Sequence, residues 1–164
     1  MGEADQAAEK HDDRVFLVVV DDTEEMKLAL RFACRRAAHT KGRVALLYVV
    51  ENSEFQHWMS VGDLMREEAR SEGEQILQRC AAEVSEQTGS LPVLYLREGS
   101  RRSQLMELID EEPSISILVL AADTGPRGPG PLVSALTGKF IGKLRVPITI
   151  VPGNLSEEEV DKIA

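Results

Sequence analysis

Glycine and proline are concentrated in one segment of the chain, from Gly125 to Phe140. Its sixteen residues, GPRGPGPLVSALTGKF, contain four glycines and three prolines and begin two residues after the apolar run ISILVLAA. Nucleotide-binding α/β proteins hold phosphate in such a stretch, because glycine allows close backbone approach and helix N-termini attract anions. The alternative is a plain loop between strand and helix, and Gly130 and Pro131 would make a tight turn in either case. The sequence therefore leaves two interpretations, a phosphate cradle and a structural strand-to-helix loop.

Paired carboxylates follow the first apolar run, at Asp21 and Asp22. In a phosphoryl-accepting receiver domain such a pair holds magnesium, together with an aspartate after the third strand and a lysine after the fifth. Here residues 97–99 are REG and residues 151–153 are VPG, which excludes a receiver domain. Asp21 keeps two interpretations. It either accepts hydrogen bonds from a ligand's amino or hydroxyl groups, or caps the following helix with Asp22 or Thr23.

The remaining reactive side chains form no recognisable catalytic set. His57 has no partner at metal-ligand spacing, because His11 and His39 lie elsewhere in the chain. No Ser-His-Asp, Cys-His or paired-carboxylate arrangement follows from order and spacing. We therefore expect no metal site and no enzyme, beyond at most slow ATP hydrolysis. The segment FQHWM (55–59) places large apolar side chains in a predicted loop, which either marks an interface or lid or folds back over the helices.

The composition is that of one globular domain with an aliphatic core. The chain has 164 residues, of which 43% are hydrophobic and only 4% aromatic, and this length suits one complete core. A net charge of −9 argues against nucleic acid or an anionic membrane as the partner, because both favour cationic surfaces. No apolar run approaches ~20 residues, so no membrane span is expected.

The first residues and the cysteines indicate the cytoplasm. Residues 1–13, MGEADQAAEKHDD, are polar and do not resemble a signal peptide, and they are expected to form a disordered tail. Cys34 and Cys80 lie in predicted helices and are expected to be reduced thiols rather than a disulfide.

Strand-like and helix-like segments alternate along residues 14–152. Short apolar runs rich in β-branched residues predict strands, and apolar positions at helical spacing predict helices. The expected strands are 14–20, 43–50, 91–99, 114–122 and 146–152, and the expected helices lie within 21–42, 60–88, 101–112 and 132–144. Ser156 and Glu159 then form a capping box that opens a short helix within 153–164. Short connections and right-handed crossovers predict a single doubly wound α/β domain, a five-stranded parallel sheet with helices on both faces.

This architecture limits where a ligand can bind. In an open parallel sheet, ligands lie beyond the carboxyl ends of the strands, where the strand order reverses. The candidates are therefore Asp21, after the first strand, and the glycine-rich stretch, after the fourth. Acidic residues after the first strand would repel phosphate there unless Mg²⁺ or the cations Arg127, Lys139 and Lys143 compensate.

Residues 14–152 resemble the universal stress protein family. The resemblance is carried by VVVDDT (18–23), by YVV (48–50) in the second strand, and by VPITIVP (146–152) in the last. Members that bind ATP have Gly-x-x-Gly, nine residues, and then Gly followed by Ser or Thr. Gly125, Gly128 and Gly138 have this spacing, but Lys139 stands where a small hydroxyl residue is expected.

The resemblance implies a Rossmann-like fold of the adenine nucleotide alpha hydrolase-like kind, with or without bound adenine nucleotide. The cofactor implied for the members that bind one is ATP with Mg²⁺. Asp21 would hydrogen-bond the adenine or its ribose, and the backbone of Val49 would contact the adenine. The phosphates would lie against the glycines of the motif and the cations beside them, which are Gly125, Arg127, Gly128, Gly138 and Lys139.

The resemblance also implies a homodimer joined along the last strand, from Pro147 to Val151. An apolar edge strand otherwise needs protection, which agrees with that interface. The implied role is regulatory or protective under stress, in the cytoplasm, with protein partners that the sequence does not identify. The alternative is a nucleotide-free dimeric interaction protein whose glycine-rich loop is only structural.

Overall fold

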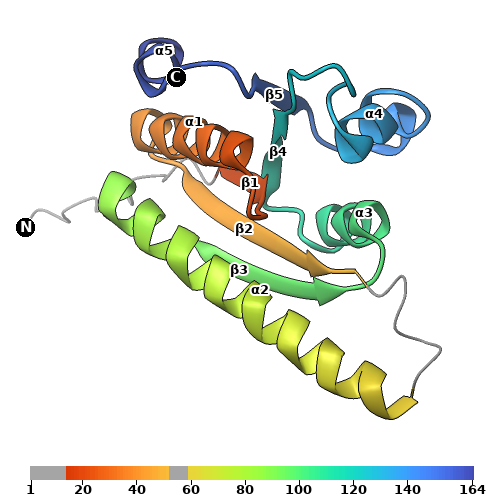
Figure 1. Ribbon diagram of the computed structural model, residues 1–164. Coiled ribbons are helices and arrows are strands. Elements are labelled where there is room, and N and C mark those ends of the chain that lie inside the picture. The colour runs from red at the N-terminus through yellow and green to blue at the C-terminus, as the bar shows by residue number, and fades with distance from the viewer. Residues whose placement is uncertain (1–13, 52–58) are drawn as a thin grey trace, which may run out of the picture.

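The computed structural model describes residues 14–51 and 59–164, which form one five-stranded parallel sheet (Figure 1). The strands have the order β3-β2-β1-β4-β5, and each neighbouring pair is parallel. Their bounds are β1 Val15–Val19, β2 Arg43–Val50, β3 Val93–Glu98, β4 Ile115–Ala122 and β5 Ile148–Pro152. The predicted doubly wound α/β fold is confirmed.

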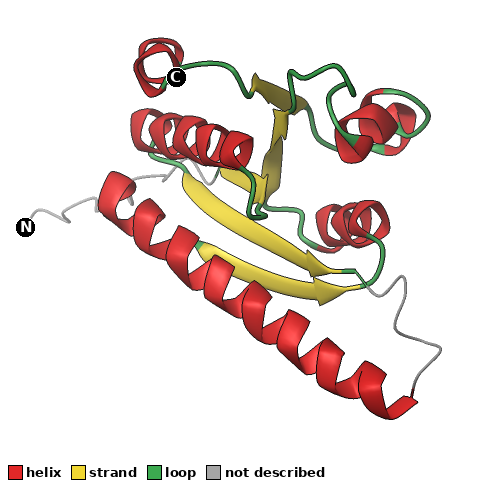
Figure 2. Ribbon diagram, in the orientation of Figure 1, coloured by secondary structure: helices red, strands yellow, loops and turns green. Residues whose placement is uncertain are grey.

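Helices cover both faces of this sheet (Figure 2). Side chains of α1 (Glu24–Thr40), α2 (Met59–Thr88) and α5 (Glu157–Ile163) pack in the cluster on one face. Those of α3 (Arg101–Glu111) and α4 (Pro131–Thr137) pack in the cluster on the other. In the described part of the chain, no helix is long and apolar enough to cross a membrane. The predictions for residues 1–13 and for 55–58 of FQHWM lie outside the described residues, and Met59 begins α2.

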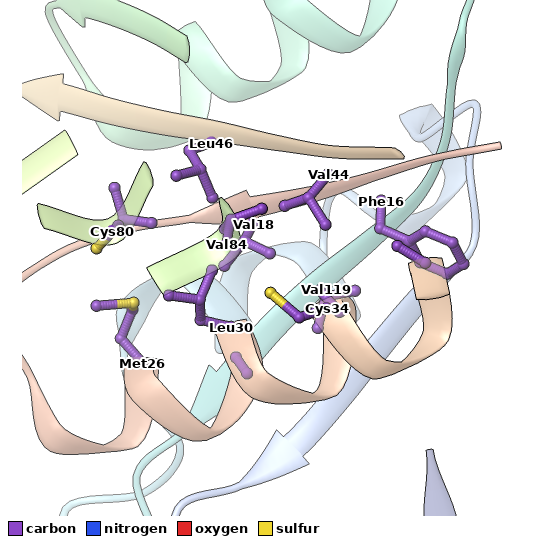
Figure 3. Close-up of a cluster of buried hydrophobic side chains, with 14 of the residues drawn as sticks. Phe16, Val18, Met26, Leu30, Cys34, Val44, Leu46, Cys80, Val84 and Val119 are labelled. Atoms are coloured by element: carbon purple, nitrogen blue, oxygen red, sulfur yellow. The ribbon is translucent and has the colours of Figure 1, made fainter. Parts of the chain in front are cut away.

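The central strand β1 is buried along its whole length, because both neighbouring strands and both helix layers cover it. Its alternate side chains divide between the two clusters: Phe16 and Val18 face α1, and Leu17 faces α3 and α4. Figure 3 shows the first cluster, with the sulfur atoms of Cys34 and Cys80 inside it. Both thiols are free, and burial raises the pKa of Cys34 to about 12 and that of Cys80 to about 11.

The ends of α1 have identifiable causes. Thr23 is its N-cap and accepts a hydrogen bond from the Met26 N–H at 3.3 Å. The helix ends at Lys41, which takes the left-handed conformation with φ 56°. Gly42, beside it, is required for a different reason, since a Cβ there would lie 2.7 Å from the Arg14 carbonyl oxygen.

The helix expected over 132–144 is wrong in extent. The structure has α4 only to Thr137, followed by one 3₁₀ turn, η2 (Ile141–Lys143). Gly138 leaves helical geometry, with φ −99° and ψ −108°, while its N–H still donates to the Ser134 carbonyl at 3.1 Å. A long helix is therefore replaced by two short ones. The N-cap of α5 is as predicted, because Ser156 Oγ accepts from the Glu159 N–H at 3.1 Å.

Candidate functional site

A crevice lies at the carboxyl ends of β1 and β4, where the strand order reverses. Strands β2 and β3 lie on one side of β1 in the sheet, whereas β4 and β5 lie on its other side. The cavity volume is about 250 Å³. Its lining residues are Val19, Asp21, Thr23, Glu25, Met26, Arg101, Leu120, Ala121, Asp123, Pro129, Gly130, Pro131, Leu132 and Val133.

Asp21 lines this crevice and also shapes the turn into α1. Its Oδ1 accepts from the Thr23 N–H at 2.8 Å and from the Thr23 hydroxyl at 2.6 Å. Thr23 in turn caps the helix. Asp21 therefore orients the cap rather than capping α1 itself, and it does so at the edge of the crevice.

The glycine-rich loop on the β4 side forms hydrogen bonds within itself. Asp123 Oδ1 accepts from the Gly125 N–H at 2.8 Å, and the Gly128 N–H donates to the Gly125 carbonyl at 3.2 Å. Gly128 and Gly130 have φ of 87° and 100°, values that favour glycine. These glycines form a compact turn, of which Gly130 reaches the crevice.

The phosphate-binding set expected from the sequence is not gathered at the crevice. Gly125, Arg127 and Gly128 belong to the exposed loop and do not line the cavity. Gly138 and Lys139 come at the opposite end of α4, because that helix ends at residue 137.

Two further predicted contacts have other surroundings. The Lys139 ammonium lies 5.7 Å from the centre of the Phe140 ring. The Val49 side chain is buried in β2 within the cluster that α3 and α4 cover, and Val49 does not line the cavity, so the expected contact of its backbone with adenine stays a prediction. Asp21 is the predicted site residue that lines it.

Sequence reasoning missed the residues that α3 contributes. Arg101 lines the crevice, and it also lines a second hollow of about 200 Å³ with Arg102 and Ser100. The signal was a basic pair directly after the third strand, at the carboxyl edge of the sheet where ligands bind. Glu25, one of the acidic residues expected here after the first strand, lines the crevice, and Asp123 adds a carboxylate that the sequence analysis did not single out.

Comparison with known proteins identifies the family. The model of the universal stress protein family matches residues 14–152. No curated protein matches the chain. Among solved structures, universal stress protein UspA from Lactobacillus plantarum superposes with a TM-score of 0.73 at 16% identity, covering 84% of this chain and 97% of that one.

Two further structures contain a nucleotide. A universal stress protein in complex with cAMP has a TM-score of 0.59 at 14% identity, and covers 87% of this chain and 98% of its own. A family protein from Arabidopsis thaliana with AMP bound has a TM-score of 0.60 at 15% identity, and covers 85% of this chain and 91% of its own. At these identities the structures establish the shared fold. With the match over residues 14–152, they show that the chain belongs to the universal stress protein family.

Proposed function

We propose that the protein is a cytoplasmic stress protein, regulatory or protective, that responds to an adenine nucleotide bound between β1 and β4. The observation that carries the proposal is the crevice at the reversal of strand order, with the Asp21 carboxylate on its lining. Open α/β sheets bind ligands at this point. Two structures of the same fold contain AMP and cAMP.

The lining chemistry suits a nucleoside. Carboxylates of Asp21, Glu25 and Asp123 can accept hydrogen bonds from amino and hydroxyl groups of a base and a ribose. Val19 and Leu120 provide apolar surface beside them for a flat ring. The volume of about 250 Å³ is at the lower limit for ligand pockets, which commonly measure ~300–1,000 Å³.

ATP with Mg²⁺ fits these residues less well than a smaller nucleotide. The glycine motif does not line the crevice, and three carboxylates do, which disfavours a triphosphate. Mg²⁺ in nucleotide sites uses one or two carboxylates together with substrate phosphates. Asp21 and Asp123 are the acids at the strand ends that could serve such an ion.

The proposed role is binding without turnover. Asp21 and Asp123 each use one carboxylate oxygen to hold a backbone turn. Within residues 14–51 and 59–164, no group of three His, Cys, Asp or Glu side chains is arranged to hold a metal ion. Phosphate release from Mg·ATP at no more than a trace rate is the expected result.

Nucleotide analysis of the purified protein tests the binding function. The protein is denatured, released nucleotide is identified by chromatography, and melting is recorded with AMP, cAMP and Mg·ATP. A ligand at ~100 times its Kd adds roughly 2.7 kcal/mol of stability, which is a shift of roughly 5–10 °C for this size of chain. No released nucleotide and no shift with any of the three would refute the proposal.

The second candidate is a nucleotide-free dimeric interaction protein. Two observations favour it: the self-contained hydrogen bonding of the glycine-rich loop, and the position of β5 at the edge of the sheet. Ile150 of β5 is 39% exposed there. A dimer joined along β5 is compatible with either function, so nucleotide binding is the observation that separates them.

A further inference from the structure

The crevice adjoins the second hollow. Arg101, Pro131 and Leu132 line both of them. The combined depression therefore runs from the ends of β1 and β4, past the start of α4, to the start of α3.

The two ends of this depression carry opposite charge. Asp21, Glu25 and Asp123 line the end at β1 and β4. Arg101 and Arg102 line the end at α3, together with one acid, Glu51. The chain as a whole has a net charge of −9, so two adjacent cations in a hollow stand out from their surroundings.

Arg101 has an unused donor at this place. Its Nε is buried and has no hydrogen-bond partner among the described residues. The Glu51 carboxylate pairs with it only loosely, because Oε1 is 4.0 Å from Nε, which is beyond hydrogen-bonding distance. Buried N–H donors nearly always have an acceptor, and an oxyanion would supply one.

Arg102 is held in position by an aromatic ring. Its Cζ lies 4.1 Å from the centre of the Phe140 ring, a cation–π arrangement. The ammonium groups of Lys139 and Lys143 lie 5.7 and 5.6 Å from the same ring. The positive potential at this end therefore comes from four side chains, of which two line the hollow.

We infer that the depression binds a nucleoside monophosphate lengthwise, with its phosphate against Arg101 and Arg102 and its nucleoside at the acidic end. This inference rests on the proposed function and assigns the phosphate to α3, not to the glycine-rich loop. Phosphate is a good acceptor for arginine, whose guanidinium offers paired donors. The three carboxylates at the other end would repel it.

Calorimetric titration with adenosine and with AMP tests the assignment. The wild type is expected to bind AMP roughly 10- to 100-fold more tightly than adenosine, as charge-assisted hydrogen bonds allow. Arg101→Gln and Arg102→Gln should each remove most of that ratio. Arg102 lines the second hollow and not the crevice, so Arg102→Gln should also leave adenosine affinity unchanged, which shows that this variant is folded. Arg127→Gln removes the same charge from the glycine-rich loop and is the matched control, expected to keep the ratio.

The outcomes separate the two proposals. Loss of the ratio in Arg127→Gln with the ratio kept in Arg101→Gln and Arg102→Gln would overturn the phosphate assignment and leave nucleotide binding intact. Equal affinity of the wild type for AMP and adenosine would also overturn the assignment. Binding of neither ligand would overturn the assignment, and the melting test with AMP, cAMP and Mg·ATP then decides whether the nucleotide function falls with it.

Discussion

Asp21 belongs both to the fold and to the crevice. It holds Thr23 through two hydrogen bonds to one oxygen, and Thr23 caps α1. A change at this position therefore acts on the stability of the empty protein as well as on a ligand.

Asp21→Ala is expected to destabilise the ligand-free protein by about 1–2 kcal/mol, because it removes the acceptor that orients the helix cap. Asp22→Ala is the matched control. Asp22 is exposed and pairs with Arg79 at 3.1 Å, a surface ion pair worth ~0–1 kcal/mol. Urea denaturation of the three proteins measures both effects. Equal stability of Asp21→Ala and the wild type would contradict the role of Asp21 in the turn.

For single residues, the sequence predicted which ones lie at the ligand-binding edge of the sheet better than it predicted which groups surround them. Asp21 could be found because it directly follows a strand, and strand ends mark the ligand edge. Arg101 follows a strand too. Its place in the crevice depends on how α3 packs against α4, and the sequence does not give that packing. Gly138 has the spacing of the ATP motif, yet its surroundings are set by where α4 ends.

Among the helices, α2 shows how packing overrides local propensity. Gly73 interrupts the helical pattern in the sequence, but α2 continues through it from residue 59 to residue 88. Close packing on the sheet explains the glycine itself, since a Cβ at Gly73 would lie 2.6 Å from the Tyr48 ring.

Gly73→Ala is expected to destabilise the protein by about 1–2 kcal/mol, because overpacking against Tyr48 exceeds the ~1 kcal/mol gain in helix propensity. Ser71→Ala, at an exposed position of the same helix, should change stability by no more than ~0.5 kcal/mol. Chemical denaturation compares the two variants. A stabilised Gly73→Ala protein would show that α2 can lift from the sheet at no cost.

Ion pairs connect the last helix, α5, with the first helix, α1. Asp161 accepts from Arg31 Nε and Nη2, both at 2.7 Å, and from Arg35 Nε at 3.0 Å. The hydrogen bonds from Arg31 are the main cause that lowers the pKa of Asp161 from 3.8 to about 2. The pKa of Asp161 is lower in the folded protein than in the unfolded chain. The ion pair therefore stabilises the fold fully at pH values above the unfolded pKa, and this stabilisation is lost as the pH falls through the folded pKa.

Asp161→Asn is therefore expected to melt below the wild type by a constant margin above about pH 5, with the two curves converging near pH 2. Melting temperatures across this range provide the measurement. Asp110→Asn, at an exposed position of α3, serves as the control and should follow the wild type throughout. A margin for Asp161→Asn that persists unchanged to pH 2 would contradict the pairing.

The sequence thus predicted which segments form helices, but not which elements those helices contact. The capping pattern at Ser156 predicts where α5 begins, whereas its docking on α1 depends on residues 130 positions apart. The end of α4 at Thr137 was not predicted, because the apolar residues on both sides of Gly138 keep a helical spacing. The helix ends there because the backbone of Gly138 has non-helical dihedral angles.

At the scale of the whole molecule, the five-stranded sheet ends in two edge strands, β3 and β5. The parallel sheet itself followed from the alternation of strands and helices. The order of the strands did not, since it is decided by pairings between segments that are distant in the chain.

Ile150 tests the proposed dimer along β5. The wild type is expected to have twice the 18.1 kDa mass of one chain by light scattering, and Ile150→Lys to have that of a monomer, since a charge would be buried between edge strands. Leu91→Lys is the control. Leu91 is 79% exposed and precedes the opposite edge strand, so its replacement should leave the dimer intact. Dissociation by Leu91→Lys alone would place the interface at β3.

The position of β1 in the sheet also has a consequence for biosynthesis. Val15 pairs with Arg43 on one side and with Ile115 on the other, and Ile115 is made about 100 residues later. At ribosomal rates of ~5–20 residues per second, β4 emerges roughly 5–20 s after β1. During this interval the nascent chain has an apolar strand with one unpaired edge, which is the kind of surface that aggregates or recruits chaperones. The yield of folded protein should therefore depend on translation speed and chaperone supply, whatever the stability of the finished molecule.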